Sequence, residues 1–257
     1  MSRIKAVINK DINQFKQSKY LWYTTILMPI IMSLLFTVSF VLPFVFAGAE
    51  EISEAPFIPE GVTDSLLIID YSMGVILPLF MLIPLMVSSI LGAHSFVTEK
   101  LSKTLEPLLA SPITDNELFI GKILAILIPV LIMTYVGIII SLIGVNIITL
   151  TSYQAFYWPT ITWLVGVIFI MPLISFIGVN FAILISSKAK DQQTAQQLTG
   201  IIALPLVALM MASIMGAFLV NLESIITIIG LLIVIAYLLF KASTKSFNHE
   251  GIITKWT

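Results

Sequence analysis

Hydrophobic positions in this chain gather into six long stretches that short polar segments separate. The stretches cover residues 20–47, 70–97, 119–148, 157–187, 198–220 and 224–241. An α-helix rises about 1.5 Å per residue, so roughly 20 apolar residues cross the hydrocarbon core of a membrane. The pattern therefore predicts six transmembrane helices. The first four exceed the required length, so we expect them to tilt, kink or extend into the headgroup layer.

The last two stretches are almost continuous and need a separate argument. One helix over residues 198–241 would be about 66 Å long, roughly twice the hydrocarbon thickness. Asn221, Leu222 and Glu223 lie in its middle. An ionised glutamate at the bilayer centre costs at least a few kcal/mol. Two spans joined by a tight turn at residues 221–223 avoid that cost, and we predict this arrangement.

A further helix is predicted before the first span, over residues 3–17. Its apolar residues recur at helical spacing on one face: Ile4, Val7, Ile8, Ile12 and Phe15. Lys5, Lys10 and Lys16 lie off that face. This pattern favours an amphipathic helix at the membrane interface. The alternative is a polar tail that simply begins the first span.

Proline and small residues within the spans predict local features. Proline occurs repeatedly, and ordinary kinks are the expected result: Pro29, Pro43, Pro78, Pro84, Pro129, Pro172 and Pro205. Small residues recur every four positions in two sets, Gly178/Ala182/Ser186 and Ala208/Ala212/Gly216. Such spacing is compatible with close contact between membrane helices.

Basic residues are confined to alternate segments of the chain. All 13 lysines and arginines fall in the N-terminal stretch, the 98–122 segment, the 188–197 loop or the tail. The other side carries carboxylates instead: Glu50, Glu51, Glu54, Glu60, Asp64, Asp70 and Glu223. Cytoplasmic loops of membrane proteins are enriched in lysine and arginine. The distribution supports six spans and predicts that both termini are cytoplasmic, in a cell (plasma) membrane protein.

Composition agrees with lipid as the solvent of this chain. Of its 257 residues, 58% are hydrophobic and 11% are charged, whereas soluble domains carry about 25% charged residues. The net charge of −1 gives no general attraction to nucleic acid, and the absence of cysteine excludes disulfides and thiol catalysis. Two histidines are too few for a histidine-based metal site. We therefore expect one all-α membrane domain over residues 1–257.

The segment 98–122, between the second and third spans, is the most informative. Residues 99–110 can form a short helix that presents leucines, and Ser111-Pro112 would end it. Thr114 followed by Glu117 predicts a capping box at the start of the third span. A short helix with leucines and charges at the membrane edge is either a docking surface for a partner or a solvated loop. The pattern alone leaves both open.

The 98–122 segment resembles the loop between the second and third spans of ABC-2 permeases. That loop reads approximately Glu-(Arg/Lys)-Glu-x-Gly-Thr-Leu-Glu-x-Leu-Leu-x-(Ser/Thr)-Pro, with a later Glu and Gly-Lys. The matching residues are Glu99, Lys100, Thr104, Leu105, Glu106, Leu108, Leu109, Pro112, Glu117, Gly121 and Lys122. Leu101 and Lys103 depart from it, where glutamate and glycine are usual. The 188–197 loop and the basic tail also resemble the family.

The resemblance implies a function and a set of site residues. Two six-span permeases would pair in the membrane, and each would dock a separate ATP-binding cassette ATPase through a coupling helix in this loop. Glu99 and Glu106 would make polar contacts with the ATPase, and Leu105, Leu108 and Leu109 would be buried anchors. Thr104 and Pro112 complete the expected coupling set. ATP and magnesium would be bound by the partner, and the family works mainly in export.

Other functions would need sequence features that this chain lacks. The chain has no Gly-x-x-x-x-Gly-Lys-(Ser/Thr) phosphate loop, and Lys122 is interpreted as a charge flanking the third span. An ion-coupled secondary transporter would need carboxylates near mid-membrane, and the predicted spans have none there. A membrane-embedded enzyme would need a positioned base, and His94 near the end of the second span is the one candidate. The sequence does not indicate the substrate.

Overall fold

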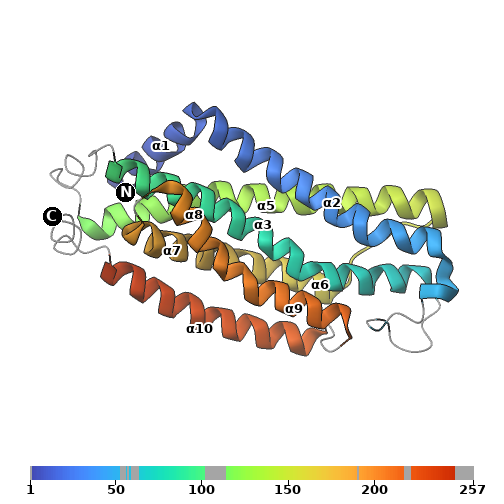
Figure 1. The fold of residues 1–257 in the computed structure, drawn as a ribbon. Helices are drawn as coiled ribbons and strands as arrows, with labels where there is room; N and C mark the ends of the chain where they lie inside the picture. The colour runs from blue at the N-terminus through green and yellow to red at the C-terminus, as the bar shows by residue number, and fades with distance from the viewer. Residues whose placement is uncertain are drawn as a thin grey trace.

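The structure is a computed structural model that describes residues 2–52, 56, 58, 64–101, 114–189, 191–216 and 221–246. Within these ranges the regular structure is entirely helical (Figure 1). The elements are α1 (Ser2–Gln17), α2 (Lys19–Ile52), α3 (Ser65–Leu101), α5 (Asp115–Tyr153), α6 (Ile161–Val165), η1 (Gly166–Ile170, a π-helix), α7 (Met171–Lys188), α8 (Gln192–Gly200), η2 (Ile201–Ala203, a 3-10 helix), α9 (Leu204–Ile214) and α10 (Leu222–Ser246). The predicted all-α class is confirmed.

In the part of the chain that the structure describes, six helical segments are long and apolar enough to cross a membrane. They are Lys19–Pro43, Ser65–Thr98, Asn116–Tyr153, Ile161–Lys188, Gln192–Ile214 and Leu222–Lys245. This agrees with the six spans predicted from the hydrophobic pattern. In Figure 1 they run roughly side by side as an elongated bundle, and α1 turns away from α2 at one end.

The boundaries of the later spans differ from the prediction. The fourth span does not begin at residue 157: residues 154–160 are not helical, and α6 starts after Thr160, whose hydroxyl accepts a hydrogen bond from the Trp163 amide at 3.4 Å. The fifth span comprises α8, η2 and α9 and ends at Ile214. Residues 221–223 do not form the predicted turn between the fifth and sixth spans. The Asn221 side chain accepts a hydrogen bond from the Ser224 amide at 2.9 Å and caps α10, which begins at Leu222.

Helix α3 lies at the centre of the bundle. It packs against α2, α5, α7, α8 and α9, and its most apolar window is 78% buried. The corresponding windows of the fifth and sixth spans are only 11% and 17% buried. Because those outer surfaces are apolar, lipid or another protein surface must cover them.

Helices α3 and α7 approach closely because small residues meet at their contact. A Cβ atom placed on Gly92 would lie 2.5 Å from the Cβ of Ala182, and one on Gly178 would lie 2.9 Å from Leu85. Gly178, Ala182 and Ser186 are all buried, so the close contact expected for this set is present. The second set behaves differently, since Ala208 is exposed and Gly216 occupies a left-handed turn at φ +70° after α9.

The fourth span contains a π-helical turn immediately before Pro172. Proline lacks an amide proton and its ring clashes with the carbonyl four residues earlier, here that of Ile168. The Tyr135 hydroxyl on α5 lies 3.5 Å from the carbonyl oxygens of both Val167 and Ile168. A neighbouring helix thus supplies a donor where the regular helical bonding is interrupted, as expected for membrane helices.

The two ends of the bundle differ in charge. The N-terminus, the start of α5, the α7–α8 junction and the end of α10 lie at one end, on the left in Figure 1. All basic residues in the part of the chain that the structure describes belong to segments at this end. The start of α3 and the start of α10 lie at the other end, with Asp64, Asp70 and Glu223. We call the first the basic end.

Candidate functional site

The predicted coupling residues lie largely outside the described part of the chain. Thr104, Leu105, Glu106, Leu108, Leu109 and Pro112 all fall outside it. Glu99 lies in the last turn of α3, with its backbone described and its side chain not. The structure therefore describes the two helices that border this site, which are α3 before it and α5 after it.

The start of α5 has the predicted capping box. The Thr114 hydroxyl accepts a hydrogen bond from the Glu117 amide at 3.3 Å, and the Glu117 carboxylate accepts from the Thr114 amide at 3.1 Å. These two bonds satisfy backbone donors that the first helical turn leaves without partners. The chain is therefore fixed where it leaves the candidate coupling segment.

A buried polar cluster joins α1 to both bordering helices. The Lys122 ammonium on α5 donates to the Asp11 carboxylate on α1 at 3.4 Å and to the Ser95 hydroxyl on α3 at 3.3 Å. Ser95 in turn donates to the same Asp11 oxygen at 3.2 Å. The Lys122 nitrogen also lies 5.0 Å from the centre of the Phe96 ring, within the range of a cation–π contact. We call Asp11, Ser95 and Lys122 the α1 clip.

The interpretation of Lys122 as a charge that merely flanks the third span is wrong. Its side chain is 0% exposed, and the Asp11 side chain is 2% exposed. A buried ammonium needs a charged or hydrogen-bonding partner, because solvation by water is lost. Sequence reasoning missed Asp11, yet it falls on the same helical face as Val7 and Phe15, four residues from each. A carboxylate within an apolar stripe was the available signal.

Helix α1 is seated against the bundle by apolar contacts on both sides of the clip. Val7 and Phe15 are buried in a cluster that includes Leu118 and Phe119 of α5. A Cβ atom on Gly121 would lie only 3.0 Å from Val7, so glycine allows α1 and α5 to approach closely at this position. The Phe15 ring also meets His94 of α3 edge-on, with 6.2 Å between ring centres. The apolar face of the predicted amphipathic helix thus packs partly on protein.

The second predicted inner loop, residues 188–197, also contacts α3 near the candidate site. Ala189 and Ala195 pack against Ala93 and Val97 of α3, and the Ser89 hydroxyl donates to the carbonyl of Gln196 at 3.1 Å. Asp191 caps α8 by accepting from the Thr194 hydroxyl at 2.6 Å and from the Thr194 amide at 2.8 Å. These hydrogen bonds hold the pKa of Asp191 below its usual range. The last turns of α3 therefore connect the clip with α8.

Polar groups within the spans bond mainly to their own helices. Thr134, Asn146 and Asn180 donate to backbone carbonyls four residues earlier. In the described ranges no group of three or more histidine, aspartate or glutamate side chains is placed to hold a metal ion. The Asp70 carboxylate accepts from the Tyr157 hydroxyl at 2.8 Å, and it lies at the end opposite the clip.

These features define a class of protein: a multi-pass, all-helical membrane protein whose central helix α3 is bonded to α1 and α5 at the basic end. Comparison with known families identifies it more closely. A family model described as "ABC-2 family transporter protein" matches residues 5–241. The chain belongs to this family, and it is the transport permease domain of an ABC transporter. Permeases of this family work with ABC ATPase partners. A comparison with curated proteins gives no match to this chain.

Proposed function

We propose that this chain is the permease subunit of an ABC exporter and that it couples to a separate ATPase subunit through residues 99–112. Two permease chains, identical or paralogous, would enclose the substrate pathway, with residues 1–257 as one domain in each. Glu99 and Glu106 would pair with polar groups of the ATPase, and Leu105, Leu108 and Leu109 would be its buried anchors. ATP and magnesium would be bound on that partner.

The observation that carries the coupling proposal is the buried clip beside the segment. Ser95 lies four residues before Glu99, and Lys122 lies eight residues after Thr114. Asp11 bonds to both, so α1, α3 and α5 are tied together at the two sides of the candidate coupling segment. A push on that segment would be transmitted to three helices rather than absorbed by one loop, because buried charge-assisted contacts resist separation.

The charge distribution supports a cytoplasmic location for the coupling segment. The described basic residues lie at one end of the bundle, and cytoplasmic loops are enriched in such residues. Both termini would then be cytoplasmic, in a cell membrane, and the ATPase would bind on the same side. The substrate would cross between the two permeases, and the exposed spans α9 and α10 would face lipid or the second permease.

A co-purification experiment tests the proposal. The tagged permease is extracted in mild detergent from its native cells, and the proteins that co-purify with it are searched for a P-loop ATPase. We expect the ATPase to remain bound, in equal numbers with the permease, and its ATP hydrolysis to depend on the permease. Recovery of the permease without any ATPase, at ATPase levels that support transport in cells, would contradict the coupling role.

A further inference from the structure

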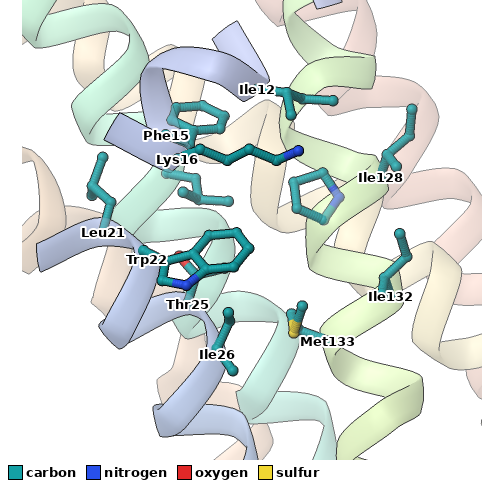
Figure 2. A pocket seen from close by; sticks show the side chains of 12 residues that line it. Ile12, Phe15, Lys16, Leu21, Trp22, Thr25, Ile26, Ile128, Ile132 and Met133 are labelled. Atoms are coloured by element: carbon teal, nitrogen blue, oxygen red, sulfur yellow. The ribbon is translucent and has the colours of Figure 1, made fainter. Parts of the chain in front are cut away.

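An apolar groove lies in the angle between α1 and α2, and it is closed on its third side by α5 (Figure 2). Its volume is about 250 Å³, a little below the roughly 300–1,000 Å³ of sites for drug-sized ligands. Ile12, Leu21, Ile26, Leu91 and Ile132 are among its lining residues. A groove of this size and character suits part of a single hydrocarbon chain.

The residues beside the groove are typical of the level where a membrane changes from polar to apolar. Helix α1 ends at Gln17 and α2 begins at Lys19, so the groove is beside the elbow between them. Three aromatic residues at the start of α2 remain well exposed, with Tyr20 at 60%, Trp22 at 44% and Tyr23 at 58%. Tyrosine and tryptophan are enriched at the headgroup level of membrane proteins. An occupant would therefore place its polar part at the elbow and its chain among the helices.

The charge at the mouth of the groove is positive. Lys16 is the one charged residue among the 12 that line it. Figure 2 shows its side chain extending from α1 across the mouth toward α5. Lys19 follows three residues later and is exposed. The nearest acidic residue on α1, Asp11, is buried in the clip and directed to Lys122.

A second, independent observation is a buried hydroxyl in the groove. Thr25 is 7% exposed and lines the groove, and its hydroxyl has no hydrogen-bond partner among the described residues. A buried hydroxyl without an acceptor is costly and uncommon in folded proteins. Other serines and threonines of α2, such as Thr24 and Ser33, donate to carbonyls of their own helix. An oxygen atom of an occupant would give the Thr25 hydroxyl this missing acceptor.

We propose that this groove binds one acyl chain of an anionic phospholipid, whose phosphate pairs with Lys16 and whose ester oxygen accepts from Thr25. The apolar lining alone would not prefer such a lipid over any other, since hydrocarbon gains little by leaving the bilayer for a groove. The selectivity for anionic headgroups comes from Lys16. This site is separate from the ATPase-coupling function, and it stands whether or not that proposal is correct.

Native mass spectrometry of the purified full chain tests the site. The protein is titrated in detergent with phosphatidylglycerol and with phosphatidylcholine of the same acyl composition. We expect one phosphatidylglycerol to bind more tightly than phosphatidylcholine. Lys16→Gln should weaken that binding about fivefold, the effect of one lysine near an anionic surface. It should weaken phosphatidylcholine binding less, because the choline ammonium of that lipid offsets the charge of its phosphate. Lys5→Gln is the matched control, because Lys5 is exposed on α1 and does not line the groove.

A second test, which does not depend on charge, fills the groove with a large side chain. Ile132→Trp should displace the bound lipid, whereas Ile139→Trp, two turns along the same face of α5 and outside the groove, should not. Equal effects of Lys16→Gln and Lys5→Gln, or retained phosphatidylglycerol in Ile132→Trp, would overturn the proposal. So would a change from dimer to monomer in Ile132→Trp with lipid binding intact, because a second copy of the chain would then cover the groove.

Discussion

The Lys122 ammonium on α5 lies 3.4 Å from the Asp11 carboxylate on α1, although 111 positions separate the two residues in the chain. Both side chains are almost completely buried, and Ser95 of α3 bonds to each. The pair thereby fixes the N-terminal helix to the two helices that border the candidate coupling segment. Movement of either helix relative to α1 must stretch or break one of these bonds.

Removing one member of the pair should destabilise the protein more than removing both. Lys122→Met leaves the Asp11 carboxylate buried, and the loss of a buried partner typically costs about 3–5 kcal/mol. Asp11→Asn with Lys122→Met removes both charges, so the double variant should be more stable than Lys122→Met alone. Denaturant unfolding in mixed micelles measures the free energies. Lys10→Met is the control, because Lys10 is 41% exposed and 4.0 Å from Asp11, and it should change stability by less than about 1 kcal/mol.

Substitutions in the candidate coupling segment should separate binding of the ATPase from folding. Glu106→Lys, or Leu108→Asp together with Leu109→Asp, should abolish co-purification of the ATPase while the unfolding temperature of the permease stays unchanged. Glu223→Lys reverses an exposed charge at the other end of the bundle and should keep the ATPase bound. Wild-type amounts of ATPase on the leucine double variant would refute the docking role.

The contact between α3 and α7 should not tolerate added volume. Gly92→Ala puts a Cβ atom 2.5 Å from that of Ala182, and overpacking of this kind costs about 1–3 kcal/mol. Gly230→Ala on α10 is the matched control, because nothing lies within 4 Å of the added atom. It should be neutral or stabilising by up to about 1 kcal/mol, since alanine favours helix. Thermal unfolding followed by size-exclusion chromatography compares the two, and similar melting temperatures would argue against the tight contact.

Tyr157 should remain un-ionised in alkaline solution. Burial, followed by the nearby Asp70 carboxylate, raises its pKa well above the ordinary 10.0. A raised pKa in the folded state means that the tyrosine stabilises the fold below pH 10 and that this contribution is lost as pH rises above that value. Tyrosinate absorbance should therefore include a step, assigned to Tyr157, that appears only on unfolding. Tyr157→Phe should remove that late step and flatten the alkaline loss of stability; ionisation of all tyrosines near their ordinary pKa would contradict it.

Much of the fold follows from the sequence because the membrane imposes a simple rule on it. Long apolar stretches bounded by charged residues predict the six spans, and the Thr114/Glu117 pair predicts the start of α5; the structure confirms both. The ends of the fourth and fifth spans were harder to place. Tyr157 and Trp158 extend the apolar stretch before Pro159 and Thr160, and residues 215–220 are apolar apart from Gly216. Hydropathy therefore does not report where Thr160 caps a helix or where Gly216 turns the chain.

The candidate site was only partly predictable, for a different reason. The candidate coupling segment is predicted from its resemblance to a family motif, whereas the α1 clip depends on contacts between residues far apart in the chain. The sequence analysis did not single out Asp11, and it interpreted Lys122 as a charge at the start of a span. Their burial results from the seating of α1 on α5 at Gly121. Periodicity within one helix cannot report which neighbour will cover it.

The wide separation of Asp11 and Lys122 has a consequence for biogenesis. Ribosomes add about 5–20 residues per second, so Lys122 is made on the order of ten seconds after Asp11. During that interval α1 has emerged and its eventual seat on the third span does not yet exist. Until then the Asp11 carboxylate lacks the ammonium that pairs with it in the folded protein, so α1 can reach its final seat only after Lys122 has been made.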